Sequence, residues 1–265
     1  MPFVDHGGCR LRYEIDGNPQ GPALLFSNSL GTTVQLWEPQ LPALSPYFRI
    51  IRYDTRGHGA SEAPQGPYSV DTLGLDAIAV LDAVAFDHAH VCGLSLGGLT
   101  AMWLAVHAPG RVQSVVLVST AARIGTTTMW DERIAQVHAS GVESLADAAM
   151  GRWFTDEFRK AHPDVVAVHR RMLSETPAIG YAACCAAIRD ADLRSEIETI
   201  TTPALIIAGH HDPVTPPADA DDMRARIPAA RVALLDGAHI INAEQPAAFN
   251  AQLSAFFTEQ RSWHG

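Results

Sequence analysis

The stretch "VCGLSLGGLT", residues Val91–Thr100, decides the fold of this chain. It places Ser95 among three glycines, directly after an apolar run that predicts a buried strand. The residues that follow, "GGLTAMWLAVHAPG", have the apolar spacing of a helix. Within the stretch, "GLSLG" matches the pattern G-x-S-x-G. Its place between a strand and a helix indicates a nucleophilic serine, because a chance match lacks that context.

The glycines have a physical explanation if the chain turns sharply from strand to helix at Ser95. Such a turn strains the serine backbone and lifts its hydroxyl clear of the sheet. Side chains at Gly93 and Gly97 would then collide with neighbouring backbone. The helix that begins there points free N–H groups at whatever the serine attacks.

A serine hydroxyl needs a base, and the base needs an acid that orients it. Two later strand ends offer these groups: "LIIAGHHDPVTPP" presents Asp212, and "VALLDGAHIINAEQP" presents His239. The chain order Ser95, Asp212, His239 is the order expected for a triad on this architecture. The alternatives are a turn role for Asp212 and a helix-capping or surface role for His239.

The oxyanion of an acyl-transfer intermediate needs two N–H donors. We expect one from Leu96, just after the nucleophile, and one from Leu30 in the loop "SNSLGTT". Asn28 of the same loop is predicted to belong to the substrate site, with support of the turn as the alternative.

Strand and helix patterns alternate along most of the chain. A hairpin at residues 3–17 and six apolar runs, at 23–30, 48–54, 88–95, 112–120, 203–209 and 230–237, predict eight strands. Helices are expected between them, at 71–86 with Asp71 as N-cap, at 97–110, 217–228 and 244–260. The pattern predicts an α/β fold with a mostly parallel sheet and helices on both faces. Residues 124–189 show only helical patterns, at 129–141, 142–154 and 179–192. We therefore predict a helical lid there, inserted into a core of residues 1–123 and 190–265.

Composition excludes several classes of protein. The net charge of −10 and the lack of any Lys/Arg run argue against nucleic-acid binding. No signal peptide, membrane span or coiled-coil heptad is recognisable. The four cysteines lack zinc spacing and predict reduced, buried thiols in a cytoplasmic protein. His210 and His211 beside Asp212 are too few for a zinc site, so no metal or cofactor is expected. His58 in "DTRGHGAS" is expected to be a hydrogen-bonded loop residue.

Taken together, "GLSLGG", "RYDTRGHGAS", "DPVTPP" and "GAHIINAEQP" resemble the α/β-hydrolase superfamily over nearly the whole chain. The segment "FSNSLGTT", with Asn28 in place of the usual histidine, and the following "LWEPQLPAL" are similar to 3-oxoadipate enol-lactonases of the β-ketoadipate pathway. The resemblance implies the α/β-hydrolase fold, a triad of Ser95, Asp212 and His239, no cofactor, and hydrolysis of the enol-lactone to 3-oxoadipate.

Such a lactone carries a carboxylate, which an acidic protein must hold locally. "MWDERIAQV" places Trp130 and Arg133 on one helix face, where arginine can grip the carboxylate and tryptophan can wall the ring. The alternative is a surface Arg133 paired with a neighbouring acid and a core Trp130. Arg152 and Arg189 are the next candidates. Two competing functions remain open: a carboxylesterase or cofactor-free haloperoxidase-like hydrolase, and a slow-turnover ligand receptor.

Overall fold

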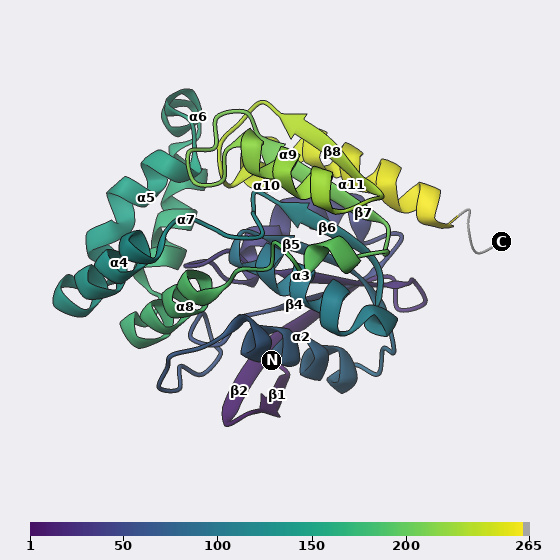
Figure 1. Ribbon diagram of the computed structural model, residues 1–265, viewed down its shortest axis with the longest axis horizontal. Coiled ribbons are helices and arrows are strands. Elements are labelled where there is room, and N and C mark those ends of the chain that lie inside the picture. Colours follow the sequence, from purple (N-terminus) through teal and green to yellow (C-terminus); the bar gives the residue numbers. More distant parts are fainter. Residues whose placement is uncertain (262–265) are drawn as a thin grey trace.

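The computed structural model describes residues 1–261 and contains one eight-stranded sheet (Figure 1). The strand order is β1-β2-β4-β3-β5-β6-β7-β8. The pairs β1–β2 and β2–β4 are antiparallel, and all later pairs are parallel, which confirms the mostly parallel eight-stranded sheet. The strands are β1 (Phe3–His6), β2 (Cys9–Gly17), β3 (Ala23–Ser27), β4 (Arg49–Tyr53), β5 (Ala89–Leu94), β6 (Val112–Val118), β7 (Ala204–Gly209) and β8 (Ala230–Leu235).

The helices surround this sheet. The α-helices are α1 (Leu41–Leu44), α2 (Val70–Ala83), α3 (Leu96–His107), α4 (Thr127–Ser140), α5 (Ala146–Trp153), α6 (Asp156–Ala161), α7 (Pro163–Ser174), α8 (Ala178–Asp190), α9 (Pro217–Arg226), α10 (Ile241–Glu244) and α11 (Pro246–Arg261). Short 3₁₀ helices are η1 (Val34–Gln40), η2 (Pro109–Arg111), η3 (Val142–Leu145) and η4 (Ile197–Thr199). Helix α3 packs against β3, β5 and β6, while α9 packs against β7 and β8.

Burial follows from this layering. Every residue of β3, β5 and β7 is buried, as expected for parallel strands covered on both faces. Strand β1, at the sheet edge, instead alternates between exposed and half-buried residues. Strand β3 ends at Ser27 and does not continue to Leu30 as predicted, so Leu30 lies in the loop that follows.

The regular elements between β6 and β7 are all helices, and residues 124–189 contain no strand. Besides the predicted helical regions it contains α6 and α7, which no separate pattern in the sequence predicted. Helix α4 packs on α8, and α5 packs on α7. Figure 1 shows α4 to α8 gathered at one end of the sheet. A Cβ built on Gly31, in the loop after β3, would lie 2.4 Å from Leu173 of α7, so this loop touches the helical segment.

Two helix boundaries differ from expectation. Ser69, not Asp71, caps α2: its hydroxyl accepts the N–H of Thr72 at 3.2 Å. Asp71 lies in the first turn and accepts the indole N–H of Trp103. The closing helix starts at Pro246, which suits the first turn because proline has no N–H to satisfy there.

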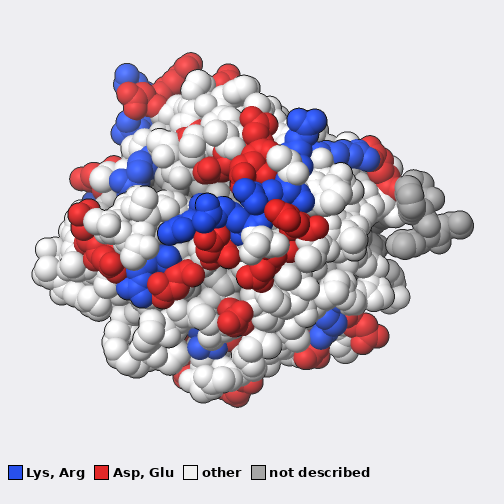
Figure 2. All heavy atoms as spheres, in the orientation of Figure 1, with Lys and Arg blue, Asp and Glu red and all other residues white. Residues whose placement is uncertain are grey.

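The viewed surface carries both signs of charge, with basic and acidic side chains directly against one another (Figure 2). Among the described residues, for example, Arg226 pairs with Asp222 and Glu198. Within residues 1–261, every helix is too short or too polar to span a bilayer.

Candidate active site

Ser95 occupies a strained turn between β5 and α3. Its φ of 55° lies in the left-handed region, which a residue with a side chain rarely adopts. The end of β6 and the residues after it hold the turn in place: the Ser95 N–H donates to the Val118 carbonyl at 2.9 Å, and the Thr120 hydroxyl donates to the Ser95 carbonyl at 2.9 Å. The serine therefore lies in the strained strand-to-helix turn that its motif predicted, and it is 6% exposed.

The flanking glycines are sterically required. A Cβ on Gly93 would lie 2.0 Å from the carbonyl oxygen of Gly97. A Cβ on Gly97 would lie 2.1 Å from the carbonyl oxygen of Ser27. In both cases the obstacle is backbone, which cannot swing aside as a side chain can.

Asp212 and His239 form a buried pair after β7 and β8. The Nδ1–H of His239 donates to Asp212 Oδ2 at 2.8 Å, and His239 and Asp212 are 2% and 3% exposed. Asp212 also accepts the N–H groups of Val214 and Thr215 and the Thr215 hydroxyl. Burial alone would raise the pKa of Asp212, but His239 and Thr215 outweigh it and the net pKa is lowered.

This pairing sets the tautomer of His239. An ionised carboxylate only accepts, so the proton sits on Nδ1 and leaves Nε2 as the basic nitrogen. Among residues 1–261, none forms a hydrogen bond with the Ser95 hydroxyl. The three residues Ser95, Asp212 and His239 follow β5, β7 and β8. They therefore lie at the same edge of the sheet, the edge formed by the carboxyl ends of the parallel strands.

The two expected oxyanion donors are also at this edge. Leu96 is the first residue of α3, so its N–H has no partner within the helix. Leu30 lies in the loop after β3, and the neighbouring Gly31 N–H is already taken by Nε2 of His58 at 2.9 Å. The bond to His58 orients the loop, and the Leu30 N–H forms no hydrogen bond within the part of the chain that the structure describes.

His58 is therefore a hydrogen-bonded loop residue, as predicted. Burial lowers the pKa of His58 to about 4, which keeps its Nε2 unprotonated and able to accept.

Asn28 holds the same loop against β4 and η1. Its amide donates to the Tyr53 carbonyl at 2.7 Å and accepts the indole N–H of Trp37 at 2.9 Å. Asn28 is 0% exposed, so both ends of its amide are committed to protein. This arrangement matches the supporting role rather than contact with substrate.

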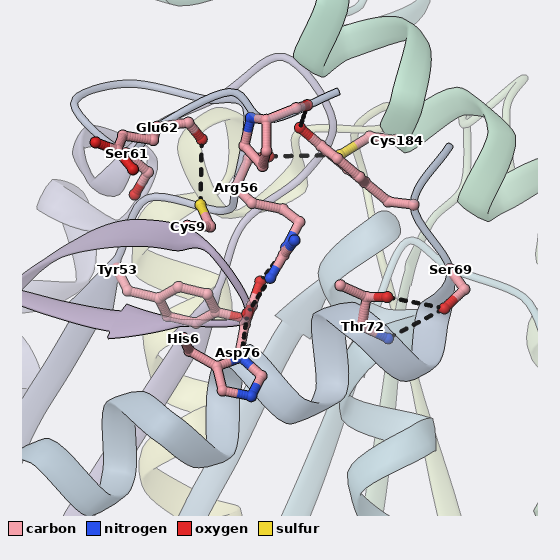
Figure 3. A network of polar contacts seen from close by, with 12 residues as sticks. His6, Cys9, Tyr53, Arg56, Ser61, Glu62, Ser69, Thr72, Asp76 and Cys184 are labelled. Atoms are coloured by element: carbon pink, nitrogen blue, oxygen red, sulfur yellow. Dashed lines mark hydrogen bonds and ion pairs between the residues drawn. The ribbon is translucent and has the colours of Figure 1, made fainter. Parts of the chain in front are cut away.

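A buried ion cluster holds the loop that carries His58 (Figure 3). Arg56 donates two hydrogen bonds to Asp76 of α2, and Asp76 also faces His6 of β1 at 2.8 Å. Cys184 of α8 reaches the Arg56 carbonyl from the opposite side at 3.7 Å. The loop is thus tied to the sheet edge, to α2 and to the helical segment.

The helical segment contributes two arginines without acidic partners. Arg133 lies over the Trp130 ring at 4.9 Å, and the Trp130 indole N–H donates to the Ile124 carbonyl at 2.7 Å. Arg152 is half-buried, and burial together with the nearby Arg133 lowers the pKa of its guanidinium. Among the described residues, neither arginine forms an ion pair with a carboxylate.

Tyr181 connects this arginine pair to the oxyanion loop. Burial raises the pKa of its phenol, and the adjacent Arg133 and Arg152 act in the opposite direction. A Cβ on Gly31 would lie 3.3 Å from the Tyr181 ring. Tyr181 therefore lies against the loop that carries Leu30, close enough to both arginines for their charges to oppose the rise in its pKa.

Arg189, the third arginine considered, is committed elsewhere. It pairs with Asp131 of α4 and with Asp190. The structure thus separates Arg189 from the Arg133–Arg152 pair.

Known proteins are similar to this chain over nearly its whole length. The family model for the alpha/beta hydrolase fold matches residues 22–246. The chain belongs to the α/β-hydrolase family. It is 43% identical to 3-oxoadipate enol-lactonase 2 of Acinetobacter baylyi, over 92% of both chains. It is 39% identical to 3-oxoadipate enol-lactonase 1 of the same organism, over 96% of this chain and 95% of that one.

A solved structure supports the same relationship. The enol-lactonase from Burkholderia xenovorans LB400 superposes with a TM-score of 0.96 at 42% identity, covering 97% of this chain and 100% of that one. The resemblance indicated by the motifs is confirmed by these relatives.

Several residues of this α/β hydrolase had no sequence signal of their own. Thr215 lies inside the quoted "DPVTPP", but its bond to Asp212 is visible only in the structure. The position of Tyr181 and the proximity of Arg152 to Arg133 depend on how separate helices pack.

The four cysteines are free and buried, and burial raises the pKa of Cys9 to about 11. Residues 1–261 contain no group of three or more His, Cys, Asp or Glu side chains able to hold a metal.

Proposed function

We propose that this chain hydrolyses 3-oxoadipate enol-lactone to 3-oxoadipate, with Ser95, His239 and Asp212 as its catalytic triad. The enol-lactonases of Acinetobacter baylyi at 43% and 39% identity support the substrate. The observation that carries a carboxylate-bearing lactone is the half-buried pair Arg133 and Arg152, which has no acidic partner among residues 1–261.

In this proposal Ser95 Oγ attacks the lactone carbonyl while His239 Nε2 takes its proton. Asp212 keeps the imidazole in the required tautomer and stabilises the imidazolium that forms. The N–H groups of Leu30 and Leu96 stabilise the oxyanion. Collapse of the intermediate breaks the ring C–O bond, the His239 imidazolium gives its proton to the leaving enolate oxygen, and an acyl-Ser95 that carries the enol remains.

The leaving group explains why ring opening is productive. An enolate is a better leaving group than an alkoxide, but it stays tethered to the acyl chain and can close the ring again. Tautomerisation to the ketone removes that return path. Water, deprotonated by His239, then attacks the acyl carbon and releases 3-oxoadipate, restoring the Ser95 hydroxyl.

Arg133 and Arg152 bind the substrate carboxylate in this proposal. Two guanidiniums close together repel each other, and an anion between them relieves that repulsion. Arginine also matches a carboxylate with two parallel hydrogen bonds. Trp130 supports Arg133 through its ring face.

We further propose that residues 124–189 act as a lid domain over a core of 1–123 and 190–265. The free thiols suit a reducing compartment such as the cytoplasm.

Turnover of the enol-lactone, followed by loss of its ultraviolet absorbance, tests the function directly. Neutral p-nitrophenyl esters of similar size serve as the comparison. We expect kcat/KM for the lactone to exceed that for the neutral esters. Equal or higher values for the neutral esters would favour the carboxylesterase alternative, and a single burst without steady turnover would favour the receptor alternative.

A further inference from the structure

The loop that carries His239 is hydrogen bonded to the helical segment on both sides of the histidine. Glu244 of α10 accepts the N–H of Ala238 at 2.8 Å through one carboxylate oxygen. Its other oxygen accepts both the N–H and the hydroxyl of Thr155, between α5 and α6. On the other side of the histidine, the Ile240 N–H donates to the Trp153 carbonyl at 3.0 Å.

We infer that Glu244 is a positioning residue that ties His239 to the arginines binding the substrate carboxylate. Arg152 directly precedes Trp153, whose carbonyl receives the Ile240 N–H. Thr155, which bonds to Glu244, lies three residues after Arg152, so Glu244 and the Trp153 carbonyl both join the His239 loop to the end of the helix that carries Arg152. Binding of the charged end of the substrate therefore positions the reacting carbonyl relative to the basic Nε2 of His239.

The chemistry of Glu244 suits this role. Its side chain meets three donors, two N–H groups and one hydroxyl, and an ionised carboxylate only accepts. The residue is 6% exposed, so these bonds lie largely out of water. A glutamine cannot replace it, because the amide NH₂ must then face a donor on one side.

The remaining bonds of the His239 loop stay within the core. Asn242 donates to the carbonyl oxygen of Leu36 and to Gln40, both in η1. Gln245 donates to the Asp236 carbonyl at 2.7 Å. Only the Glu244 and Ile240 bonds, among those of the described residues, join this loop to the helical segment. Loss of the Glu244 side chain should therefore weaken the contact between the His239 loop and the helical segment. The hydrogen bonds that hold the loop against the core remain.

Thr155 offers an independent way to break the contact. Its hydroxyl donates to Glu244 and accepts the N–H of Phe158 as the N-cap of α6. Thr155→Val removes the hydroxyl bond to Glu244, and Thr155→Ser keeps it. Gln245→Ala is the matched control, because it removes a side-chain bond next to Glu244 that stays within the core.

The inference rests on the proposed carboxylate-binding function, and the experiment separates the two. Wild-type turnover of the enol-lactone tests the function without any Glu244 variant. For Glu244, kcat and KM are measured for two matched esters, the p-nitrophenyl hemiester of succinate, which carries a carboxylate, and neutral p-nitrophenyl butyrate. The enol-lactone is added as a third substrate if wild type turns it over.

Glu244→Gln and Thr155→Val should lower kcat on the charged substrate about tenfold, the scale of a lost hydrogen bond to a charged group, with less effect on KM. The neutral ester should lose only about two- to threefold, because it does not use the arginine pair. Thr155→Ser and Gln245→Ala should behave like wild type on both.

Equal losses on charged and neutral esters would overturn the inference and leave Glu244 as a support of His239 or of the fold alone. Unchanged kinetics in folded Glu244→Gln would overturn it as well. If Glu244→Gln does not fold, Thr155→Val with its Thr155→Ser rescue gives the same decision.

Discussion

The edge of the sheet and the helical segment above it hold their residues in different ways. At the edge, nearby backbone contributes directly: Ser95 lies in its own strained turn, and Asp212 accepts the N–H groups of Val214 and Thr215. In the helical segment, Arg133 and Arg152 come from α4 and α5, and their meeting depends on helix packing. The difference suggests that the edge performs the chemistry on any ester, while the helices select the substrate.

Substitutions in the two regions should therefore affect turnover differently. Variants of the triad should impair charged and neutral substrates alike, and variants of the arginine pair should discriminate between them.

Ser95→Ala should abolish turnover of every substrate, with kcat reduced by on the order of 10⁶, as for nucleophile removal in a comparable triad. Steady-state kinetics on the lactone and on a neutral ester measure the loss, and thermal unfolding shows that the fold is intact. Ser119 gives a matched control, since it also has a positive φ at a strand end. Ser119→Ala should retain most activity. Near-normal turnover by folded Ser95→Ala would disprove the nucleophile.

Asp212→Asn should lower kcat by about 10⁴, because an amide facing His239 Nδ1 favours the wrong tautomer. The same factor should appear for the enol-lactone and for a neutral ester, since both need the same base. A loss confined to one of these substrates would contradict the division between edge and helices.

His58→Gln tests the support of the oxyanion loop through pH-dependent stability. The pKa of His58 is lowered to about 4, chiefly by burial, whereas the unfolded chain takes up a proton near its ordinary value of about 6.5. The unfolded state then binds more protons between these values, so wild-type stability falls as pH drops from about 6.5 to 4, by on the order of 3 kcal/mol.

A glutamine side chain in place of His58 does not titrate, and its Oε1 can accept the Gly31 N–H as the imidazole does. Urea unfolding of wild type and His58→Gln between pH 7 and 4 measures the difference. The variant should lose less stability across that window. Parallel curves for the two proteins would show that His58 is not the group responsible.

Arg133→Ala should lower kcat/KM for the enol-lactone by about 10- to 100-fold and leave a neutral ester almost unaffected. Arg133→Lys should recover part of the loss, because an ammonium cannot reproduce the planar guanidinium. Arg189→Ala is the control on the same helical segment, since Arg189 pairs with Asp131 and Asp190. Equal losses on both substrates would make Arg133 a structural residue.

Asp219→Asn should give the smallest effect, a gain in stability at pH 7. Burial, together with the charges of Asp212 and Asp222, raises the pKa of Asp219 to about 6. The folded state therefore holds its proton after the unfolded state has lost it, and wild-type stability falls as pH rises from about 4 to 6.

The asparagine variant lacks this loss. With allowance for partial solvent screening it should be more stable by about 1 kcal/mol above pH 6 and no more stable below pH 4. Chemical denaturation at pH 4 and pH 7 measures both values. A gain of equal size at both pH values would contradict the titration of Asp219.

Local patterns predicted the edge of the sheet well. Buried parallel strands show as continuous apolar runs, and glycines around Ser95 mark a turn that no other residue fits. The strand ends that carry Asp212 and His239 followed from the same runs. Errors at this level were small and local, such as the N-cap at Ser69, where Asp71 proved to bond to Trp103.

The sequence by itself determined the alternation of strands and helices, the elbow at Ser95 and the chain order of the pair Asp212 and His239. Each of these depends on backbone geometry within a few residues, which spacing and glycine placement reveal. Only the tertiary structure decided that Asn28 supports its loop, that Arg152 joins Arg133, and that Glu244 binds Thr155, 89 positions away. Such contacts are chosen by how whole helices pack against the sheet, and no local pattern in a chain records which distant side chain will fill a given space.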